Sequence, residues 1–191
     1  LITWATITEG GVQVNAAGER FWNEAQGYSE AARAVLSQAQ GVAYAIFDGR
    51  ISEIAEQFED FKRAKSVGAI KSSETLEELA EDLGLPADTL CKTIADISPN
   101  STDRFGRTFG ETALSPPFCG VRVTGALFHT QGGLKVDTSA RVICKNGSII
   151  SNLYAGGGAA CGVSGSGDSG YLSGNGLLSA VVLGRIAGNA S

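Results

Sequence analysis

The stretch GSGDSGYLSGNG, Gly165 to Gly176, contains two short motifs that belong to different folds. Gly165, Gly167 and Gly170 match G-x-G-x-x-G, which in dinucleotide-binding folds joins a strand to the N-terminus of a helix. The overlapping Gly-Asp-Ser-Gly is the sequence that surrounds the nucleophilic serine of trypsin-like proteases. The segments on either side of this stretch decide between these folds and a third one.

The dinucleotide motif lacks the strand–helix–strand context that it needs. The nearest expected strand ends well before Gly165, and only 21 residues follow Gly170. This length is too short for a helix, a second strand and the acidic residue that binds the ribose. We therefore interpret the match as a chance product of a glycine-rich tail.

The protease motif also lacks its catalytic environment. Ser169 would need a histidine as its base, and His129 is the only histidine in the chain. No trypsin-type motif surrounds His129, and the helices predicted before residue 117 do not suit a double β-barrel. A serine hydrolase stays open as an alternative, which covalent labelling of Ser169 by a fluorophosphonate would reveal.

The composition excludes several classes of protein. The chain has 191 residues, of which 43% are hydrophobic and 18% charged, so it is long enough for one or two folded domains. Its net charge of -5 disfavours binding to nucleic acid. The sequence has no run of roughly 18 apolar residues, and Leu1 does not open a signal segment. We therefore expect no membrane span and a cytoplasmic location.

The cysteines and the histidine do not form a metal-binding pattern. The four cysteines are widely scattered, without a C-x-x-C pair, and one histidine cannot complete a zinc site. We expect reduced thiols and no metal.

The predicted elements divide the chain at Pro116-Pro117, and the predicted fold class is α+β. Before this point, apolar patterns predict strands over 2–7, 11–14 and 42–47, and helices over 29–40, 51–61, 73–84 and beyond Pro86. After it, we expect strands over 121–128 and 149–155 and a helix over 173–187. Residues 1–117 thus form a mixed α+β unit, and residues 118–191 a glycine-rich α/β unit.

Three segments carry a resemblance to a known family. They are Val14-Asn-Ala-Ala-Gly-Glu-Arg-Phe-Trp-Asn-Glu24, Thr130-Gln-Gly-Gly-Leu134 with Val136-Asp137, and the glycine-rich stretch from Asn152 to Gly188. Together they resemble the flavoprotein family of fumarate reductases, succinate dehydrogenases and 3-ketosteroid dehydrogenases. The first two resemble V-N-x-x-G-x-R-F-x-N-E and T-x-G-G-L-x-x-D of that family, and the third is similar to the segment that closes its FAD site.

The resemblance implies FAD as the cofactor and a split domain. Residues 1–117 would be the capping domain, and residues 118–191 the C-terminal part of the FAD-binding domain. The dinucleotide fold that binds the adenosine pyrophosphate would lie in a missing N-terminal segment, so we expect the fragment alone to be inactive. The family positions of the cofactor-binding residues are His129, Thr130, Gly156, Gly157, Gly158, Asn175, Gly176, Leu177 and Leu178.

Departures from the family pattern indicate the substrate. Tyr28 stands where fumarate reductases have a proton-donating arginine, and Tyr171 stands where they have a second arginine. Phe128 takes the place of a carboxylate-binding histidine, with His129 beside it, and Gly158 replaces a frequent glutamate. Losing these cations removes the charge that clamps a dicarboxylate. The tyrosines instead resemble the base and the carbonyl-polarising residue of ketosteroid dehydrogenases.

The implied reaction is dehydrogenation or ene-reduction of a C–C bond beside a carbonyl, in a small carbonyl or carboxylate substrate. Flavin N5 would exchange a hydride at one carbon and Tyr28 a proton at the other, while Tyr171 and backbone N–H groups stabilise the enolate. Tyr28 and Tyr171 are the catalytic candidates, and Phe128 and Gly174 the substrate-binding ones. Two alternatives stay open. One is a fumarate/succinate- or tricarballylate-type carboxylate oxidoreductase, and the other is a non-catalytic structural or binding fragment.

Overall fold

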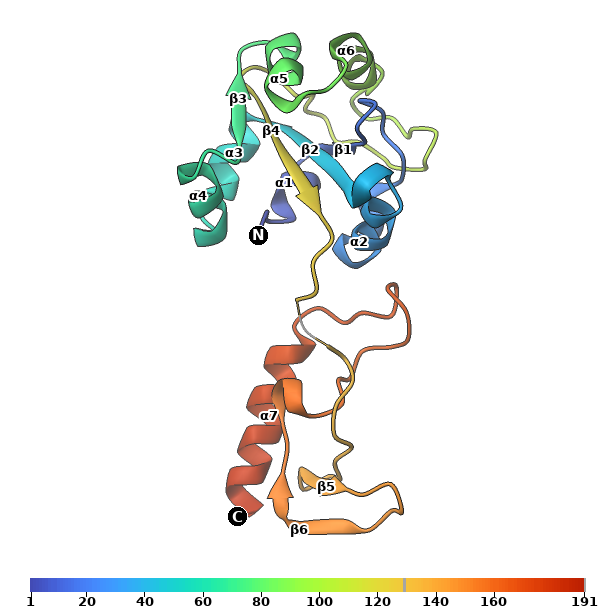
Figure 1. Ribbon diagram of the computed structural model, residues 1–191, viewed down its shortest axis with the longest axis vertical. Helices are drawn as coiled ribbons and strands as arrows, with labels where there is room; N and C mark the ends of the chain where they lie inside the picture. The colour runs from blue at the N-terminus through green and yellow to red at the C-terminus, as the bar shows by residue number, and fades with distance from the viewer. Residues whose placement is uncertain (129, 191) are drawn as a thin grey trace. The chain divides into compact units, whose positions relative to one another are not determined.

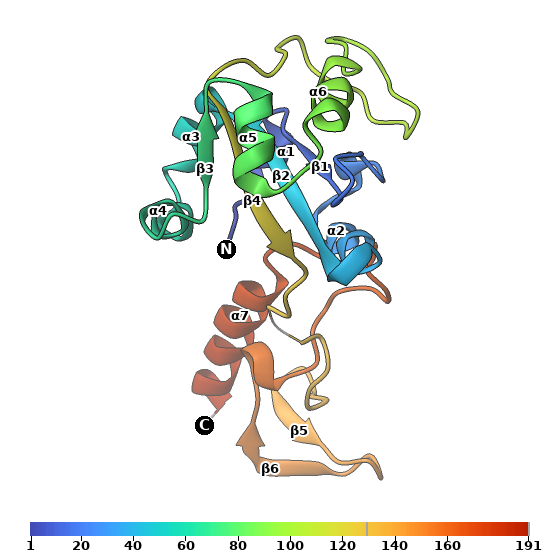
Figure 2. The same ribbon diagram turned by 45° about the horizontal axis from the view of Figure 1, so that its top comes forward.

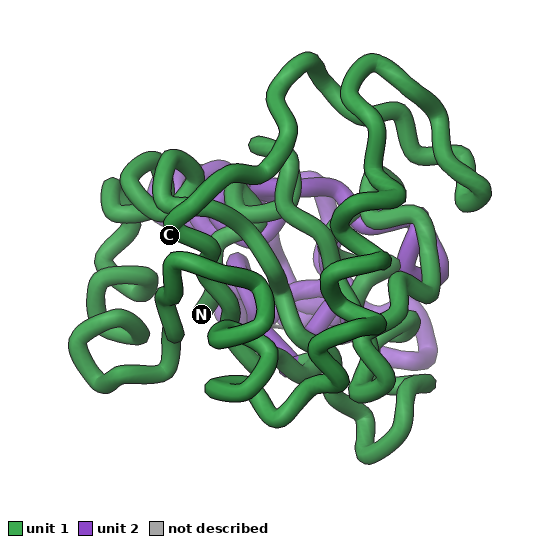
Figure 3. Tube along the Cα trace, turned by 90° about the horizontal axis from the view of Figure 1, so that it is seen from above, with its two compact units in different colours: residues 1–125 green, residues 126–191 purple. Residues whose placement is uncertain are grey.

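The computed structural model describes residues 1–128 and 130–190, and the chain divides into two compact units. Unit 1 comprises residues 1–125 and unit 2 residues 126–191 (Figure 3). The division follows β4 (Phe118–Thr124) and so falls on the C-terminal side of the boundary expected at Pro117. β4 belongs to unit 1 because it pairs along its whole length with β2 (Val42–Asp48).

An antiparallel sheet forms the middle of unit 1 (Figure 1). Its strands run in the order β1 (Val12–Val14), β2, β4 and β3 (Lys71–Ser73). Side chains alternate along β2, so Ile46 packs on one face of the sheet and its neighbour Phe47 on the other. Both faces of the sheet are apolar, so other elements must bury both of them.

Helices bury the two faces of this sheet (Figure 2). On the face of Ile46, α5 (Leu76–Leu83) and α6 (Ala87–Ala95) supply Leu79 and Leu90. On the face of Phe47, α3 (Gly49–Ala55) and α4 (Glu59–Ser66) supply Ile51 and Phe61. The core of unit 1 therefore lies on both sides of one sheet.

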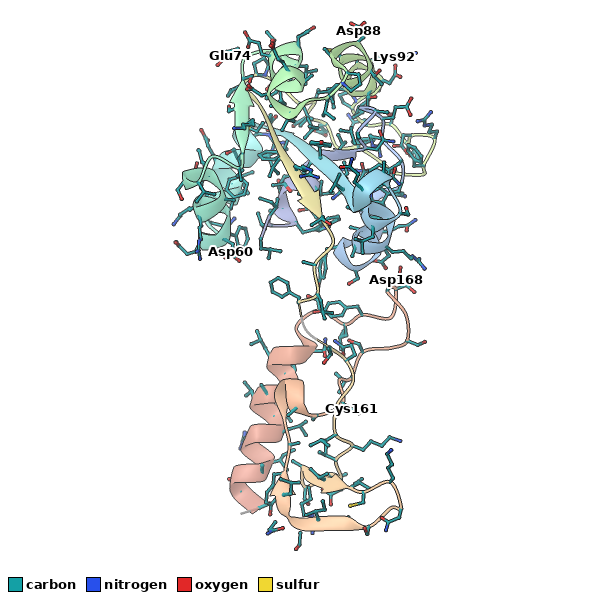
Figure 4. The ribbon with its side chains drawn as sticks, viewed as in Figure 1. Asp60, Glu74, Asp88, Lys92, Cys161 and Asp168 are labelled. Atoms are coloured by element: carbon teal, nitrogen blue, oxygen red, sulfur yellow. The ribbon has the colours of Figure 1, made fainter. Side chains whose placement is uncertain are left out.

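The outer sides of the helices carry charged residues. Figure 4 shows Asp60 on α4, Glu74 just before α5, and Asp88 and Lys92 on α6 at the surface of unit 1. All four residues are exposed. These charges therefore form solvated helix faces.

Local signals set the ends of α5. The Thr75 hydroxyl oxygen accepts a hydrogen bond from the Glu78 backbone N–H (3.2 Å), and Gly84 ends the helix with a left-handed φ of 68°. The helix predicted over 73–84 is present as α5, but it begins at Leu76, and Ser73 belongs to β3.

The strand predicted over 2–7 is wrong, because residues Ala5–Thr8 form the single helical turn α1. Its β-branched residues suit a strand, yet Thr6 and Ile7 are buried in the folded unit. The Gly11 backbone N–H donates to the Thr6 carbonyl (3.1 Å), and a Cβ on Gly11 would lie 2.1 Å from that oxygen. Tertiary packing therefore overrides the strand propensity here.

Two other predicted elements have different bounds in the structure. The helix predicted over 51–61 is two helices, α3 and α4, because Phe58 adopts an extended conformation between them. The strand predicted over 121–128 is β4, which ends at Thr124.

A buried carboxylate organises the start of unit 1. Glu24 opens the 3-10 turn η1 (Glu24–Gln26), and its side chain is fully buried. The carboxylate accepts hydrogen bonds from Arg20 Nε (2.9 Å) and the Gln13 backbone N–H (3.0 Å). It also lies 3.1 Å from Arg107 Nη1. The V-N-A-A-G-E-R-F-W-N-E segment therefore folds around its own acid.

Arg107 and Asp103 extend this network to a distant part of the chain. Arg107 Nη2 donates to the Ile7 carbonyl of α1 (2.9 Å), while Asp103 forms an ion pair with Arg20. Burial raises the pKa of the Asp103 carboxyl, but hydrogen bonds from Arg20 and from the backbone N–H groups of Arg107 and Phe105 outweigh burial. The net effect holds this pKa below its ordinary value.

Unit 2 consists of a hairpin and one long helix. β5 (Arg141–Ile143) pairs with β6 (Ile149–Tyr154), and η3 (Gly157–Ala159) and α7 (Asn175–Ala190) follow. A small apolar cluster of Val142, Ala155 and Ala160 packs against Leu183 of α7. Helices and antiparallel strands occur together in this chain, so the predicted α+β fold class is confirmed. Within the described ranges, none of the helices has the length and apolar character to span a membrane.

We predict that Glu24→Gln destabilises unit 1 by about 3 kcal/mol, because the buried guanidinium groups of Arg20 and Arg107 then lose the carboxylate that pairs with both. Urea unfolding followed by tryptophan fluorescence measures this loss. Glu59→Gln is the matched control, since Glu59 pairs with Lys62 at the surface with 86% of its side chain exposed. Removing such a pair changes stability little. Equal losses in both variants would contradict the structural role of Glu24.

The lowered pKa of Asp103 predicts a specific pH dependence. Its carboxylate stabilises the fold fully above the unfolded pKa of about 4, and this stabilisation disappears as the pH falls through the lower folded value. Asp103→Asn should therefore lower the melting temperature at neutral pH and flatten its decline below about pH 4. Melting curves across this range test the effect, and an unchanged acid limb would refute it.

Candidate functional site

Tyr28 is the first residue of α2 (Tyr28–Leu36) in unit 1. Gly27 before it has a φ of 128°, a conformation open to glycine, and this turn directs the chain from η1 into α2. The helix predicted over 29–40 therefore begins one residue earlier and ends at Leu36. Tyr28 is 44% exposed within the chain. A fixed helix start thus presents a phenol that stays partly accessible.

Two tryptophans pack beside this phenol. The Trp4 and Tyr28 rings meet edge to face, with centroids 6.3 Å apart and planes at 73°. Trp4 also lies 6.4 Å from Trp22, whose Nε1–H donates to Gln13 Oε1 (3.0 Å). Trp22 is buried, so the three rings form a row that runs from the interior of unit 1 to Tyr28.

In unit 2 the T-x-G-G-L segment runs beside the residues that follow η3. The Leu134 N–H donates to the Ala159 carbonyl (2.9 Å), and the Leu134 carbonyl accepts from the Cys161 N–H (3.0 Å). A Cβ on Gly133 would lie 2.4 Å from the carbonyl carbon of Ala160, so only glycine fits. The motif is therefore a close contact between two backbones.

The glycines after β6 differ in what requires them. A Cβ on Gly156 would lie 3.1 Å from Leu183 Cβ, and one on Gly157, which has a φ of 56°, would lie 3.2 Å from Ala180 Cβ. These two glycines let η3 approach α7 closely. Gly158 has no atom within 4 Å of an added Cβ, and its φ lies outside the left-handed region. Its backbone faces open space in the described chain.

The stretch that contains G-x-G-x-x-G closes on itself. The Gly165 N–H donates to the Gly170 carbonyl (2.7 Å), so the two ends of the motif bond to each other. The Leu172 N–H also donates to the Ser164 hydroxyl oxygen (3.0 Å). Among the described residues the preceding strand is β6, which ends at Tyr154, so the dinucleotide context is absent there. The serine-hydrolase alternative stays untested, because its base, His129, lies outside the described residues.

Asn175 attaches this loop to the start of α7. Its side chain is buried, and Nδ2 donates to the Leu172 carbonyl (2.9 Å). Gly174 before it has a φ of 79°, and Tyr171 is partly buried in the same loop. The structure therefore gives the Asn175 amide a loop-closing contact.

Part of the predicted cofactor set lies on or against α7. Gly156 and Gly157 contact this helix at Leu183 and Ala180, and Asn175 and Gly176 begin it. Leu177 and Leu178 on α7 are exposed. Phe128 and Thr130 are also exposed, and the predicted His129 lies outside the described residues. Of the catalytic candidates, Tyr28 belongs to unit 1 and Tyr171 to unit 2.

Sequence reasoning missed Trp4 and Arg107. Trp4 lay in a segment predicted as a strand, and no feature of the sequence indicated its contact with Tyr28. Arg107 had a usable signal, since Arg20/Glu24 and Asp103/Arg107 are opposite charges spaced four residues apart.

Two of the four cysteine thiols have raised pKa values. Within residues 1–128 and 130–190, three metal-ligating side chains do not come together anywhere. Burial raises the pKa of the Cys119 and Cys91 thiols, which keeps them protonated. Cys161 in unit 2 (Figure 4) donates from its sulfur to the Gly133 carbonyl (3.0 Å).

Comparison with known proteins places the chain among flavoproteins. The family described as FAD binding domain matches residues 1–177. The NADH:acrylate oxidoreductase of Vibrio harveyi is 36% identical over 191 residues, covering 94% of this chain and 18% of the relative. The open conformation of a flavocytochrome c3 fumarate reductase matches with a TM-score of 0.77 and 29% identity, covering 100% of this chain and 34% of that one.

A 3-ketosteroid Δ1-dehydrogenase from Sterolibacterium denitrificans matches with a TM-score of 0.60 and 25% identity, covering 94% of this chain and 38% of that one. The chain thus spans at most 38% of the length of these three proteins.

We predict that Gly133→Ala destabilises unit 2 by about 2 kcal/mol, because the added methyl group overlaps the Ala160 backbone. Gly132→Ala is the matched control, since a Cβ there meets nothing within 4 Å. Thermal unfolding of both variants measures the difference. Equal melting temperatures would contradict the close backbone contact.

Proposed function

The chain belongs to the family of the FAD binding domain, whose cofactor is FAD, and from this premise we propose that it is part of a flavin-dependent oxidoreductase. The predicted resemblance to fumarate reductases and ketosteroid dehydrogenases is confirmed. In this proposal, residues 1–117 act as the capping domain and residues 118–191 as the C-terminal part of the FAD domain. The reaction is oxidation or reduction of a C–C bond adjacent to a carbonyl.

The bare backbone of unit 2 fits a flat cofactor. Gly132 and Gly158 have open space where a side chain would stand, and η3 is held against α7. The start of a helix also presents backbone N–H groups without intrahelical partners. When bound, FAD supplies hydride transfer. The residues proposed to hold it are His129, Thr130, Gly156, Gly157, Gly158, Asn175, Gly176, Leu177 and Leu178.

An exposed apolar side of α7 indicates that another segment of polypeptide covers this part of unit 2. Leu177 and Val181 are 77% and 70% exposed, and Gly184 and Gly188 continue the same stripe of the helix. Exposed apolar stripes of this kind mark surfaces that another element covers. We propose that a dinucleotide fold, N-terminal to these residues, packs there.

Tyr28 exchanges the proton in this proposal. In the reductive direction its hydroxyl donates a proton to the carbon next to the carbonyl, while a hydride adds to the second carbon; dehydrogenation runs in reverse. A phenol is a weak acid and base near neutral pH, so the developing enolate needs stabilisation. The Tyr171 hydroxyl and backbone N–H groups near Gly174 are proposed to supply it, and Phe128 lines the substrate.

The observation that carries this proposal is the placement of Tyr28. The phenol lies four residues after the end of the V-N-A-A-G-E-R-F-W-N-E segment, on a helix start that follows a buried ion network, and it is 44% exposed.

A carboxylate oxidoreductase is the second candidate. It is favoured by the 36% identity to the acrylate oxidoreductase and by the higher TM-score of the fumarate reductase, 0.77 against 0.60 for the ketosteroid dehydrogenase. The two tyrosines at the expected arginine positions favour an uncharged carbonyl substrate instead.

We also infer a cytoplasmic location, because all four cysteines are free, as in a reducing compartment.

In the full-length flavoprotein, Tyr28→Phe should lower turnover by about a hundredfold or more while FAD absorbance persists, because the proton donor is lost. Tyr154→Phe is the matched control: it removes another tyrosine hydroxyl, which donates to the Ala190 carbonyl (3.0 Å), and should leave turnover unchanged. Reduced-flavin reoxidation by enones and by unsaturated carboxylates identifies the substrate class. Undiminished turnover of the Tyr28 variant with bound FAD would remove Tyr28 from this role.

A further inference from the structure

We propose that Trp4 is a positioning residue for the Tyr28 phenol. This inference rests on the proposed role of Tyr28 in proton exchange. Trp4 contacts Tyr28 edge to face, with ring centroids 6.3 Å apart and planes at 73°. Aromatic pairs favour this edge-to-face arrangement over a face-to-face stack, so the indole restricts the orientation of the phenol ring.

The other side of Trp4 is fixed as well. Its ring lies 6.4 Å from Trp22, at an interplanar angle of 47°. Trp22 cannot turn freely, because it is 9% exposed and its Nε1–H donates to Gln13 Oε1 (3.0 Å). Gln13 in turn lies in β1, so the aromatic row is anchored to the sheet. Because Trp4 is itself held in place, it restricts the position of the Tyr28 ring, the most exposed of the three.

A single buried guanidinium holds the two backbone segments that carry this pair. Arg107 Nη2 donates to the Ile7 carbonyl (2.9 Å) in α1, the turn that Trp4 begins. Arg107 Nη1 lies 3.1 Å from Glu24 Oε2, at the start of the turn that leads into Tyr28. The backbones under both rings are therefore braced to one another, and the edge contact is a stable feature of unit 1.

This arrangement has a kinetic consequence. Proton transfer to carbon needs the phenol oxygen close to the reacting atom, and a misplacement of about 1 Å can cost about a hundredfold in rate. A residue that only orients Tyr28 affects the chemical step more than substrate binding. Loss of the Trp4 ring should therefore lower kcat with little change in KM.

The first test compares Trp4→Leu, Trp4→Phe and Tyr28→Phe in the full-length flavoprotein. We expect Trp4→Leu to lower kcat by about tenfold or more with KM nearly unchanged and FAD retained. Trp4→Phe keeps a ring edge toward Tyr28 and should recover most of kcat. Phe58→Leu is the control, since it removes another partly exposed ring of unit 1.

The second test needs no turnover. The 191 residues contain two tryptophans, so in a Trp22→Phe background the tryptophan fluorescence of this chain reports on Trp4 alone. Tyr28→Leu in that background should change its emission, and Tyr154→Phe should not. Unchanged emission overturns the contact even where Trp4→Leu fails to fold.

The outcomes separate this inference from the proposed function. A parental kcat in Trp4→Leu, together with a large loss in Tyr28→Phe, overturns the role of Trp4 alone. Equal losses in folded Trp4→Phe and Trp4→Leu also overturn it, because the ring would not be the active feature. A parental rate in Tyr28→Phe refutes the proposed function instead.

Discussion

The burial of the Glu24 carboxylate is the constraint on which unit 1 depends. A charge removed from water is costly unless partners surround it, and here Arg20, Arg107 and the Gln13 backbone N–H do so. Those partners come from β1, from the segment before η1 and from the long connection between α6 and β4. Satisfying one acid therefore brings three parts of the chain together and fixes the turn that leads into Tyr28.

Unit 2 is organised by missing side chains instead of buried charge. Gly133 allows two backbones to approach where a Cβ would collide, and Gly156 and Gly157 allow the chain at η3 to lie close against α7.

The sequence predicted those elements whose signals are local. The stop signal Gly84 and the spacing of the leucines before it marked α5, and the short apolar run 42–47 marked β2. It failed where distant contacts decide: α1 reads as a strand until Gly11 and its neighbours enclose it, and Arg20 gives no hint that Asp103, 83 residues away, is its partner. The motif resemblance pointed to the glycines and to Tyr28. Only the structure distinguishes Gly133, where close packing requires glycine, from Gly158, where it does not.

The most direct measurement is a crystal structure of the full-length protein with FAD and a bound substrate analogue. We expect the Tyr28 hydroxyl to lie within about 3.5 Å of the carbon beside the carbonyl, with the Gly158 backbone against the flavin ring. A Tyr28 hydroxyl turned away from the ligand, or a flavin remote from Gly156 to Gly158, would contradict it.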